Sequence, residues 1–377
     1  MSKQLIEIFS SKSDPRGTVE SLLSKLRAFI ELKHWHEFEE GLLSLVFEYQ
    51  YKDVVPLLEC VFSELSTFLD PVIQIELLGV MLEKSTQDDS AKMRAISKLK
   101  EALPKTDLIS AFLIIQEVRT LFISKDFEKG FEKLLQAEEI VESHRSVPKT
   151  IFNALYSCKL IYFWQREDFS RYSSCFSQFL AYINISRFTP EQQVHLAEQS
   201  LQASLLASEV LTFGHLLDHS FLDHISKNQH NQDLLHLVHC FSRGDIDQVN
   251  SLLEDNSVIF RKYPLLLKQQ KQLRRKIQII TLYNTVFYSQ TERQGFQVSF
   301  RQIAKASQVD MEEVEKLVIL SFSIGLFVGK IDQENDIVNI QSVRPQDIDI
   351  KRLPLLKEKF VDWKNTIERT LETIASM

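Results

Sequence analysis

The chain has 377 residues and a formal charge of −7, from 44 basic and 51 acidic side chains. Hydrophobic residues make up 44% of it and charged residues 25%, which are ordinary values for a globular protein. The acidic balance argues against a general nucleic-acid binder, because attraction to phosphate depends on basic side chains.

From its start to about residue 290 the chain predicts α-helix almost throughout. Nine glycines and nine prolines, against 26 phenylalanines, favour long helices with aromatic contacts and few turns. Thr18 can cap an early helix, and Asp70 followed by Pro71 is a clear helix start. Thr189 and Pro190 form another, with a capping box. The helix from Pro190 is expected to place one apolar stripe on Val194, Ala197, Leu201, Leu205 and Leu211.

Four segments share a polar turn followed by an amphipathic helix, which indicates a loose internal repeat. An apolar residue anchors each of them: Trp35, Phe127, Phe169 and Ile246. Their separations are near multiples of about 40 residues, a period typical of two-helix repeats that stack into a solenoid. The sequence therefore predicts a mostly α fold that begins with a right-handed helical-repeat solenoid of TPR or HEAT type. An irregular helical bundle is the alternative.

Residues 296–340 predict a winged helix, which is a short strand, two helices and a two-stranded hairpin. Val298 lies in the expected strand, and a short helix follows from Phe300. Asp310 is expected to cap the second helix in a capping box with Glu313, and Gly325 to end it. Two β-branched runs, 327–331 and 337–340, then flank a turn at 332–335.

The predicted winged helix carries the wrong charge for binding DNA. Acidic side chains occupy the start of the second helix and the hairpin turn, where they would repel phosphate. The module is therefore expected to dock on protein, because the edge strand of a hairpin is a template for pairing with another chain. We expect the hairpin part of this interface to comprise Phe327, Val328, Ile331, Ile337, Val338 and Ile340.

A last helix is expected after a polar connector at residues 342–351. Its large apolar side chains recur three or four residues apart and form a narrow seam on a charged helix. Such a seam needs a groove, and a partner subunit is favoured over the chain's own domain as its source. The seam residues, which complete the predicted interface, are Leu356, Phe360, Trp363, Ile367, Leu371 and Ile374.

The sequence offers little for catalysis or metal binding. His34, His36 and Ser44 match part of a metal-dependent isopeptidase motif, but Phe47 stands where that motif has a ligating aspartate. Six of the ten histidines lie between His215 and His239, yet no H-E-x-x-H pattern occurs and exposed helical histidines explain them. Nucleotide-binding loops and nucleophile motifs are also missing. We predict no enzyme activity, no cofactor, no metal site and no catalytic residue.

Three further features bear on partners and compartment. Residues 261–276 hold seven basic side chains and no acidic one. This favours the solvated face of a helix with an acidic protein as its expected partner, and RNA contact or a nuclear signal is the alternative. The four cysteines share no CxxC spacing and are expected to be reduced and buried. No signal peptide or membrane-spanning run is recognised. We expect a soluble protein of the cytoplasm and nucleus with no membrane partner.

The ordered series of these features resembles the PCI-domain scaffold proteins, and within them the 26S proteasome non-ATPase regulatory subunit 13 family. The resemblance covers residues 200–365 best, and the first 150 residues match only in helical character and length. The residues that carry it are His219 and the runs 213–217, 273–278, 300–305, 314–318, 323–326, 329–332 and 343–345.

This resemblance implies helical repeats at 1–180, a PCI domain at 181–341 and a linker with a bundle helix at 342–377. Within the PCI domain it implies a helical part at 181–290 and a winged helix at 291–341. The implied function is a non-catalytic scaffold of the proteasome lid that supports ubiquitin-dependent degradation. Its partners would be other PCI subunits, through winged-helix edges and a bundle of terminal helices, and a ubiquitin-receptor subunit near the helical arm. A subunit of the COP9 signalosome or of a translation-initiation complex, or an RNA adaptor, is the alternative.

Overall fold

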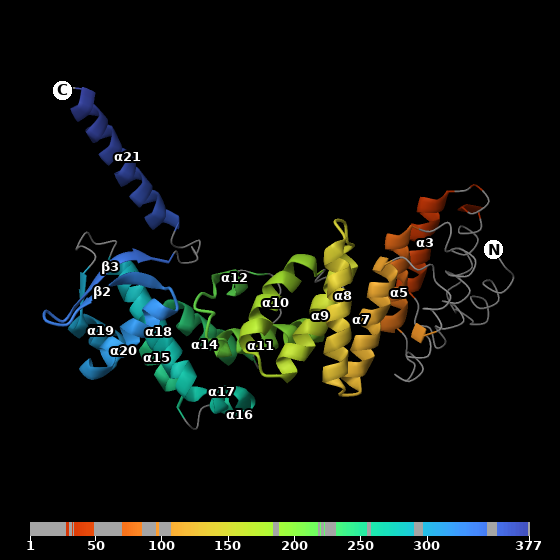
Figure 1. Ribbon diagram of the computed structural model, residues 1–377, viewed down its shortest axis with the longest axis horizontal. Helices are drawn as coiled ribbons and strands as arrows, with labels where there is room; N and C mark the ends of the chain where they lie inside the picture. Colours follow the sequence, from red (N-terminus) through yellow and green to blue (C-terminus); the bar gives the residue numbers. More distant parts are fainter. Residues whose placement is uncertain are drawn as a thin grey trace. The chain divides into compact units, whose positions relative to one another are not determined.

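The structure is a computed structural model, mostly α-helical in its described residues (Figure 1). The chain divides into two compact units, residues 1–183 and 184–377. The predicted helix after Thr18 lies outside the described residues. The structure describes residues 28–29, 32, 34–48, 70–84, 96–97, 107–183, 188–217, 219, 222, 231–254, 258–289, 297–344 and 353–375.

Unit 1 is built from helices that pack on helices close to them in sequence. Its described helices are α3 (Trp35–Glu48), α5 (Pro71–Lys84), α7 (Asp107–Ile123), α8 (Phe127–Ser143), α9 (Lys149–Gln165) and α10 (Phe169–Tyr182). α7 packs on α8 and α9, and α9 packs on α10, as stacked hairpins do. The predicted start of α5 is confirmed, because the Val72 N–H donates to Asp70 Oδ1 at 3.1 Å.

One turn recurs between three pairs of helices: α7 and α8, α9 and α10, and α14 (Gln232–Arg243) and α15 (Ile246–Leu252). It consists of a residue with positive φ, an aspartate and the apolar residue that begins the next helix. The three copies are Lys125-Asp126-Phe127, Glu167-Asp168-Phe169 and Gly244-Asp245-Ile246.

The same two backbone hydrogen bonds close every copy of this turn. The N–H of the positive-φ residue donates to the carbonyl three residues earlier, and the aspartate N–H donates to the carbonyl five residues earlier. This is the pairing of a Schellman motif, which satisfies the last carbonyls of a helix. The predicted repeat anchors are confirmed as helix starts, since Trp35, Phe127, Phe169 and Ile246 are the first residues of α3, α8, α10 and α15.

Unit 2 begins with helices arranged around one central helix, α18 (Gln270–Ser289). α18 packs on α11, α14, α15 and α17, and also on two helices of the mixed α/β part that follows it. The Thr189 capping box is confirmed. The predicted stripe is wrong for Leu211, because α11 ends at Leu206 and Leu211 lies beyond the helix. The other described helices of this part are α11 (Pro190–Leu206), α12 (Gly214–Leu217), α16 (Val258–Lys262) and α17 (Pro264–Lys268).

Lys276 of α18 is buried, which corrects the expectation that it lies on a solvated basic face. Its Nζ donates to the carbonyls of Ser204, Leu205 and Ala207 at 2.6, 3.1 and 2.6 Å. It also lies 5.3 Å from the centre of the Phe213 ring. Burial lowers the pKa of Lys276 well below its usual value. One side chain thus satisfies the carboxyl end of α11, where the helix dipole favours a cation.

The mixed part of unit 2 has the order that the sequence predicts: strand, helix, helix, hairpin. Its antiparallel sheet has the strand order β1-β3-β2, with Val298 opposite Val338. Gly329 allows the hairpin to close, because a Cβ there would lie 2.3 Å from the Asn339 carbonyl oxygen. The elements are β1 (Gln297–Ser299), α19 (Phe300–Ser307), α20 (Met311–Ser323), β2 (Phe327–Asp332) and β3 (Ile337–Val343).

The helix ends in this part follow local sequence signals, with one exception. Asp310 makes no side-chain capping bond, so the predicted capping box with Glu313 is wrong. The capping box lies instead at the start of α19, where Ser299 and Gln302 bond reciprocally. The S-x-x-Q pattern there was a sufficient signal. Gly325 ends α20 with a φ of 74°, as predicted.

The end of the sheet is tied to the central helix. The Tyr283 hydroxyl of α18 donates to the Arg344 carbonyl at 2.6 Å, and the Arg344 N–H donates to the Leu326 carbonyl at 2.7 Å. The last helix of the chain is α21 (Leu353–Ala375). In the part of the chain that the structure describes, no helix combines the length and the apolar character that crossing a bilayer requires.

Candidate protein-interaction site

The hairpin presents one strand edge. β3 lies between β1 and β2, so β2 forms an outer edge of the sheet in the described residues. A register shift between Val328 and Gly329 interrupts this edge, and Lys330 is exposed on β2. Bulges and lysines on an edge strand are the devices that restrict indiscriminate pairing. The β2 edge is therefore protected against indiscriminate pairing, although no described strand covers it.

The six predicted hairpin residues divide into core and surface. Phe327, Val338 and Ile340 are at most 3% exposed, so the interface prediction is wrong for these three side chains. They point to the side of the sheet that packs on helices, where the ring of Phe327 lies 5.2 Å from that of Phe322 on α20. Period-2 alternation identifies two faces of a strand but does not say which of them the chain itself covers.

The remaining hairpin residues stay accessible to a partner. Val328 is 56% exposed, and Ile331 and Ile337 are half-buried. Val328 and Ile331 lie on the edge strand β2, whereas Ile337 lies on the central strand β3, where it pairs with Asp332 of β2 and Ser299 of β1. These three side chains are the part of the predicted hairpin interface that the geometry leaves available.

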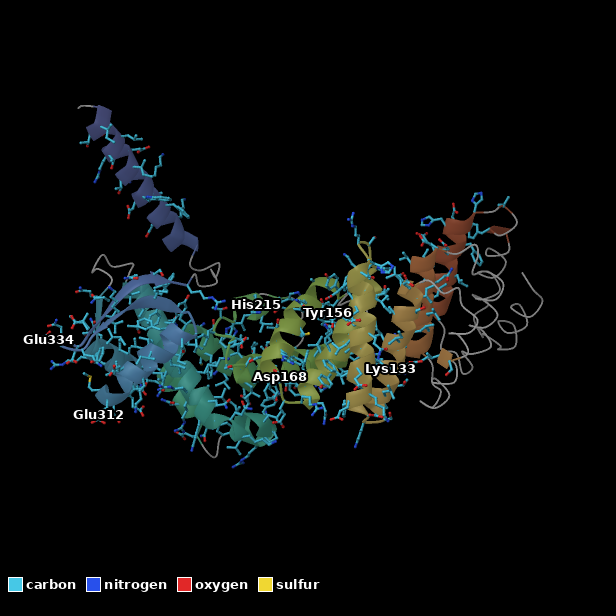
Figure 2. All side chains as sticks on the ribbon, viewed as in Figure 1. Lys133, Tyr156, Asp168, His215, Glu312 and Glu334 are labelled. Atoms are coloured by element: carbon cyan, nitrogen blue, oxygen red, sulfur yellow. The ribbon has the colours of Figure 1, made fainter. Side chains whose placement is uncertain are left out.

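Acidic side chains surround the start of α20 and the hairpin turn. Glu312 and Glu334 are both exposed, and Figure 2 shows their side chains directed outward. Gln333 of the turn donates to Glu315 of α20, which ties the two acidic segments together. Hydrogen bonds from Asn335 lower the pKa of Asp332. This surface is negative, which disfavours contact with a phosphate backbone.

α21 carries the second part of the predicted interface. The helix has 23 residues, about 35 Å at the usual rise, and all of its described side chains are exposed. Five predicted seam residues are 44–63% exposed: Phe360, Trp363, Ile367, Leu371 and Ile374. The side chain of Leu356 lies outside the described residues. The structure thus places an apolar seam in solvent.

The opposite face of α21 is polar and internally bonded. The Thr366 hydroxyl donates to the Asp362 carbonyl at 2.8 Å, and Lys364 pairs with Glu368 at 3.6 Å. Such exposed contacts contribute a few tenths of a kcal/mol each. They support a helix with two distinct faces, one solvated and one that lacks a cover in the described part of the chain.

The histidines and cysteines do not assemble into a ligand set in the described residues. His236 Nε2 lies 3.8 Å from Cys240 Sγ, and that thiol donates to Gln248 Oε1 at 3.3 Å. Among the described residues no three His, Cys, Asp or Glu side chains are placed to share a metal ion. Burial raises the pKa of the Cys158 and Cys175 thiols to about 11. The three described cysteines are buried and free, as predicted, and Cys60 lies outside the described residues.

Comparison with known proteins gives long matches. The chain is 26% identical to the 26S proteasome regulatory subunit RPN9 of Saccharomyces cerevisiae, over 97% of this chain and 94% of that protein. It is 20% identical to the 26S proteasome non-ATPase regulatory subunit 13 of Dictyostelium discoideum, over 93% of this chain and 92% of that protein. A shorter match is to the eukaryotic translation initiation factor 3 subunit M of Pyricularia oryzae. It is 25% identical over 50% of this chain and 41% of that protein.

A family model described as PSD13 N-terminal repeats matches residues 22–238. The match spans all the described helices of unit 1 and continues through α11, α12 and the first half of α14 in unit 2. It includes two of the three recurring turns described above, those at Lys125 and Glu167. The chain therefore belongs to the PSD13 family.

Proposed function

We propose that this protein is a non-catalytic scaffold subunit of the 26S proteasome regulatory lid, and that it supports lid assembly and ubiquitin-dependent degradation. The observation that carries the proposal is the seam of α21, with five large apolar side chains in solvent. A seam of this kind marks a site for another polypeptide. Relatives that match the chain almost end to end are named as proteasome regulatory subunits, which supports the choice of assembly.

We further propose that residues 181–341 form a PCI domain whose last part, 291–341, is a winged helix. The order of β1, α19, α20 and the hairpin supports this, as does the packing of α18 on both α14 and α20. Residues 1–180 would then form a right-handed helical-repeat arm, supported by the recurring hairpin turn. Residues 342–377 would supply the linker and the bundle helix.

Two surfaces would hold the neighbouring subunits. The β2 edge, with Val328, would pair with the winged helix of an adjacent PCI subunit. The α21 seam would enter a bundle with the terminal helices of other subunits. Complete burial of each large seam side chain would contribute about 1.5–3 kcal/mol, so the seam is the stronger of the two contacts. A ubiquitin-receptor subunit would lie near the helical arm.

The main alternative is a PCI scaffold of another complex. The match to a translation initiation factor 3 subunit supports it, but that match covers 50% of this chain and 41% of the relative. The proteasome relative from Saccharomyces cerevisiae covers 97% and 94%. The longer alignment favours the lid over a translation-initiation complex. With the lid as its assembly, the protein would act in the cytoplasm and nucleus.

Truncation after Pro345 tests the proposal. We expect the shortened chain to fold, because the described side chains of α21 bury nothing against the rest of the chain. It should lose helical signal only in proportion to the deleted helix, and keep the cooperative thermal transition of the full chain. Expressed with a tag in cells of the source organism, the full chain should elute with proteasome subunits and the truncated chain should elute alone.

The readout is gel filtration followed by mass spectrometry of the tagged fractions. A truncated chain that joins the assembly at the yield of the full chain would show that α21 is not needed for assembly. A full-length chain that elutes as a solitary monomer, or with translation factors in place of proteasome subunits, would overturn the proposed function itself.

A further inference from the structure

The segment of unit 2 at residues 258–289 differs in charge from the rest of the chain. It contains seven lysines and arginines and no aspartate or glutamate, in a protein whose net charge is −7. The structure folds it as α16, α17 and α18, in place of the single basic helix that the sequence predicted (Figure 1). Pro264 begins α17, which breaks the helical run.

The fold employs some of these cations internally. Lys276 caps α11 from the core, as described above. Lys262 Nζ donates to Asp233 Oδ2 at 3.0 Å, which ties α16 to α14. Arg275 is half-buried and donates to Gln278 at 3.3 Å. These three residues are accounted for by the stability of unit 2.

The other four are exposed: Arg261, Lys268, Lys271 and Arg274. We call them the basic surface. They come from contiguous parts of the fold, because α17 packs on both α16 and α18. Lys271 and Arg274 are three residues apart on α18 and therefore share a face. In the described part of the chain, no carboxylate pairs with Arg261, Lys271 or Arg274 within ion-pair distance.

Two aliphatic side chains lie among these cations. Val258 on α16 is 56% exposed and Leu267 on α17 is 45% exposed. The aromatic rings of α16 and of its junction with α17 are buried, since Phe260 is 3% and Tyr263 is 7% exposed. The Tyr263 hydroxyl also donates to Asn231 Oδ1 at 3.3 Å. The surface thus offers cations and aliphatic contacts but no ring from α16 or α17.

These properties favour one class of ligand. Proteins that hold single-stranded RNA stack its bases on exposed aromatic rings, which this surface does not present. An acidic polypeptide segment with an apolar side chain matches both the charge and the aliphatic residues. We propose that the basic surface docks an acidic, leucine-containing segment of another protein. The proposal goes beyond the scaffold function, because this surface is formed by neither β2 nor α21.

The test uses the purified full-length chain and a fluorescent 18-residue peptide of glutamates with leucine at every fourth position. We expect saturable one-to-one binding. The variant R261E/K271E/R274E should weaken it at least about tenfold, because three charge contacts become repulsive. The matched control is R301E/K305E/K316E, which reverses three exposed cations on α19 and α20 and changes the net charge equally. The control should bind within about twofold of the unmodified chain, because distant exposed charges are largely screened.

Three results would overturn the proposal. The first is equal weakening by both triple variants, which would show a response to net charge alone. The second is undiminished binding of a peptide with serine in place of leucine, which would remove the role of Leu267. The third is tighter binding of a 20-nucleotide uridine oligomer than of the peptide, through the same three residues, which would assign the surface to RNA. Each of these outcomes leaves the α21 truncation test unaffected.

Discussion

Two regions of unit 2 each contain an amphipathic helix, but only one of them buries the apolar stripe of its helix. In the body, residues 190–344, α14 buries its apolar stripe, and Leu234, Leu237, Val238 and Phe241 are all 0% exposed. In α21 a stripe of equal regularity leaves Phe360 57% and Trp363 62% exposed. Both stripes predict a helix with one apolar face. They differ in whether the chain itself provides the covering surface.

The body also satisfies the polar groups at several of its helix and strand ends. Lys276 satisfies the end of α11, a Schellman turn satisfies the end of α14, and Tyr283 holds the carbonyl of Arg344. Changes at these internal contacts should act through the stability of the fold. Changes on the uncovered seam of α21 should leave the fold intact. The free energy of unfolding separates the two cases.

The largest expected loss of stability is at Phe241. Replacement by alanine should lower the free energy of unfolding by about 3–5 kcal/mol, because it removes a fully buried ring and leaves a cavity. The ring packs against Phe213, with 6.4 Å between the ring centres. The same replacement at Phe360 is the matched control and should change stability by less than about 0.5 kcal/mol. Urea unfolding of both variants measures the contrast, and equal losses would erase the distinction between the two stripes.

The next largest effect is expected at Lys276. Methionine keeps the length of the side chain but donates no hydrogen bond, so three carbonyls at the end of α11 lose their partner. We expect a loss of about 2–4 kcal/mol, which reflects unsatisfied buried acceptors offset by the smaller cost of burying a neutral group. Lys271→Met, on the exposed face of the same helix, should be nearly neutral. A neutral Lys276→Met would show that the capping bonds add nothing.

Lys276 also predicts a pH dependence with a definite sign. Burial lowers its pKa in the folded chain below the usual 10.5. Between the two values the unfolded chain binds more protons than the folded chain, so the free energy of unfolding rises with pH through this window. Unfolding curves at a series of pH values should show this rise in the unmodified chain relative to Lys276→Met. A difference that falls with pH would contradict the assignment.

A smaller effect is expected at the recurring turn. Gly244 has a φ of 73°, and a Cβ there would lie 2.5 Å from Asn284 Nδ2. Alanine should therefore cost about 1–2 kcal/mol. In the equivalent turn of unit 1, Glu167 has a φ of 55°. Glycine there should raise stability by about 0.5 kcal/mol, because relief of left-handed strain outweighs the added entropy of the unfolded chain. Thermal unfolding of both variants distinguishes the signs.

Local patterns of the sequence predicted much of this fold. The anchors Phe127 and Phe169, the capping box at Thr189 and the glycine at 325 were each visible as short-range chemistry. Long-range pairing was not, because a lysine spaced like a surface residue can still meet a helix end 69–72 positions away, as Lys276 does. The same limit explains Phe327, Val338 and Ile340, since alternation cannot say which sheet face meets α20. The exposed seam of α21 was predictable from its local spacing, because no other described part of the chain packs on it.

The smallest expected change in stability accompanies the largest expected change in assembly. The double variant F360A/W363A should alter the free energy of unfolding by less than about 0.5 kcal/mol, because both side chains are already in solvent. It should nevertheless lower recovery of the chain in the proposed complex by more than about tenfold, since large aromatic side chains dominate most interfaces. The control K364A/E368A alters the polar face of the same helix, where an exposed pair at 3.6 Å contributes little. If the control abolishes assembly as fully as the double variant does, then the helix is read by its charge and not by its seam. If F360A/W363A instead unfolds unit 2, then the chain itself covers the seam, and α21 resembles α14 in burying its apolar stripe within unit 2.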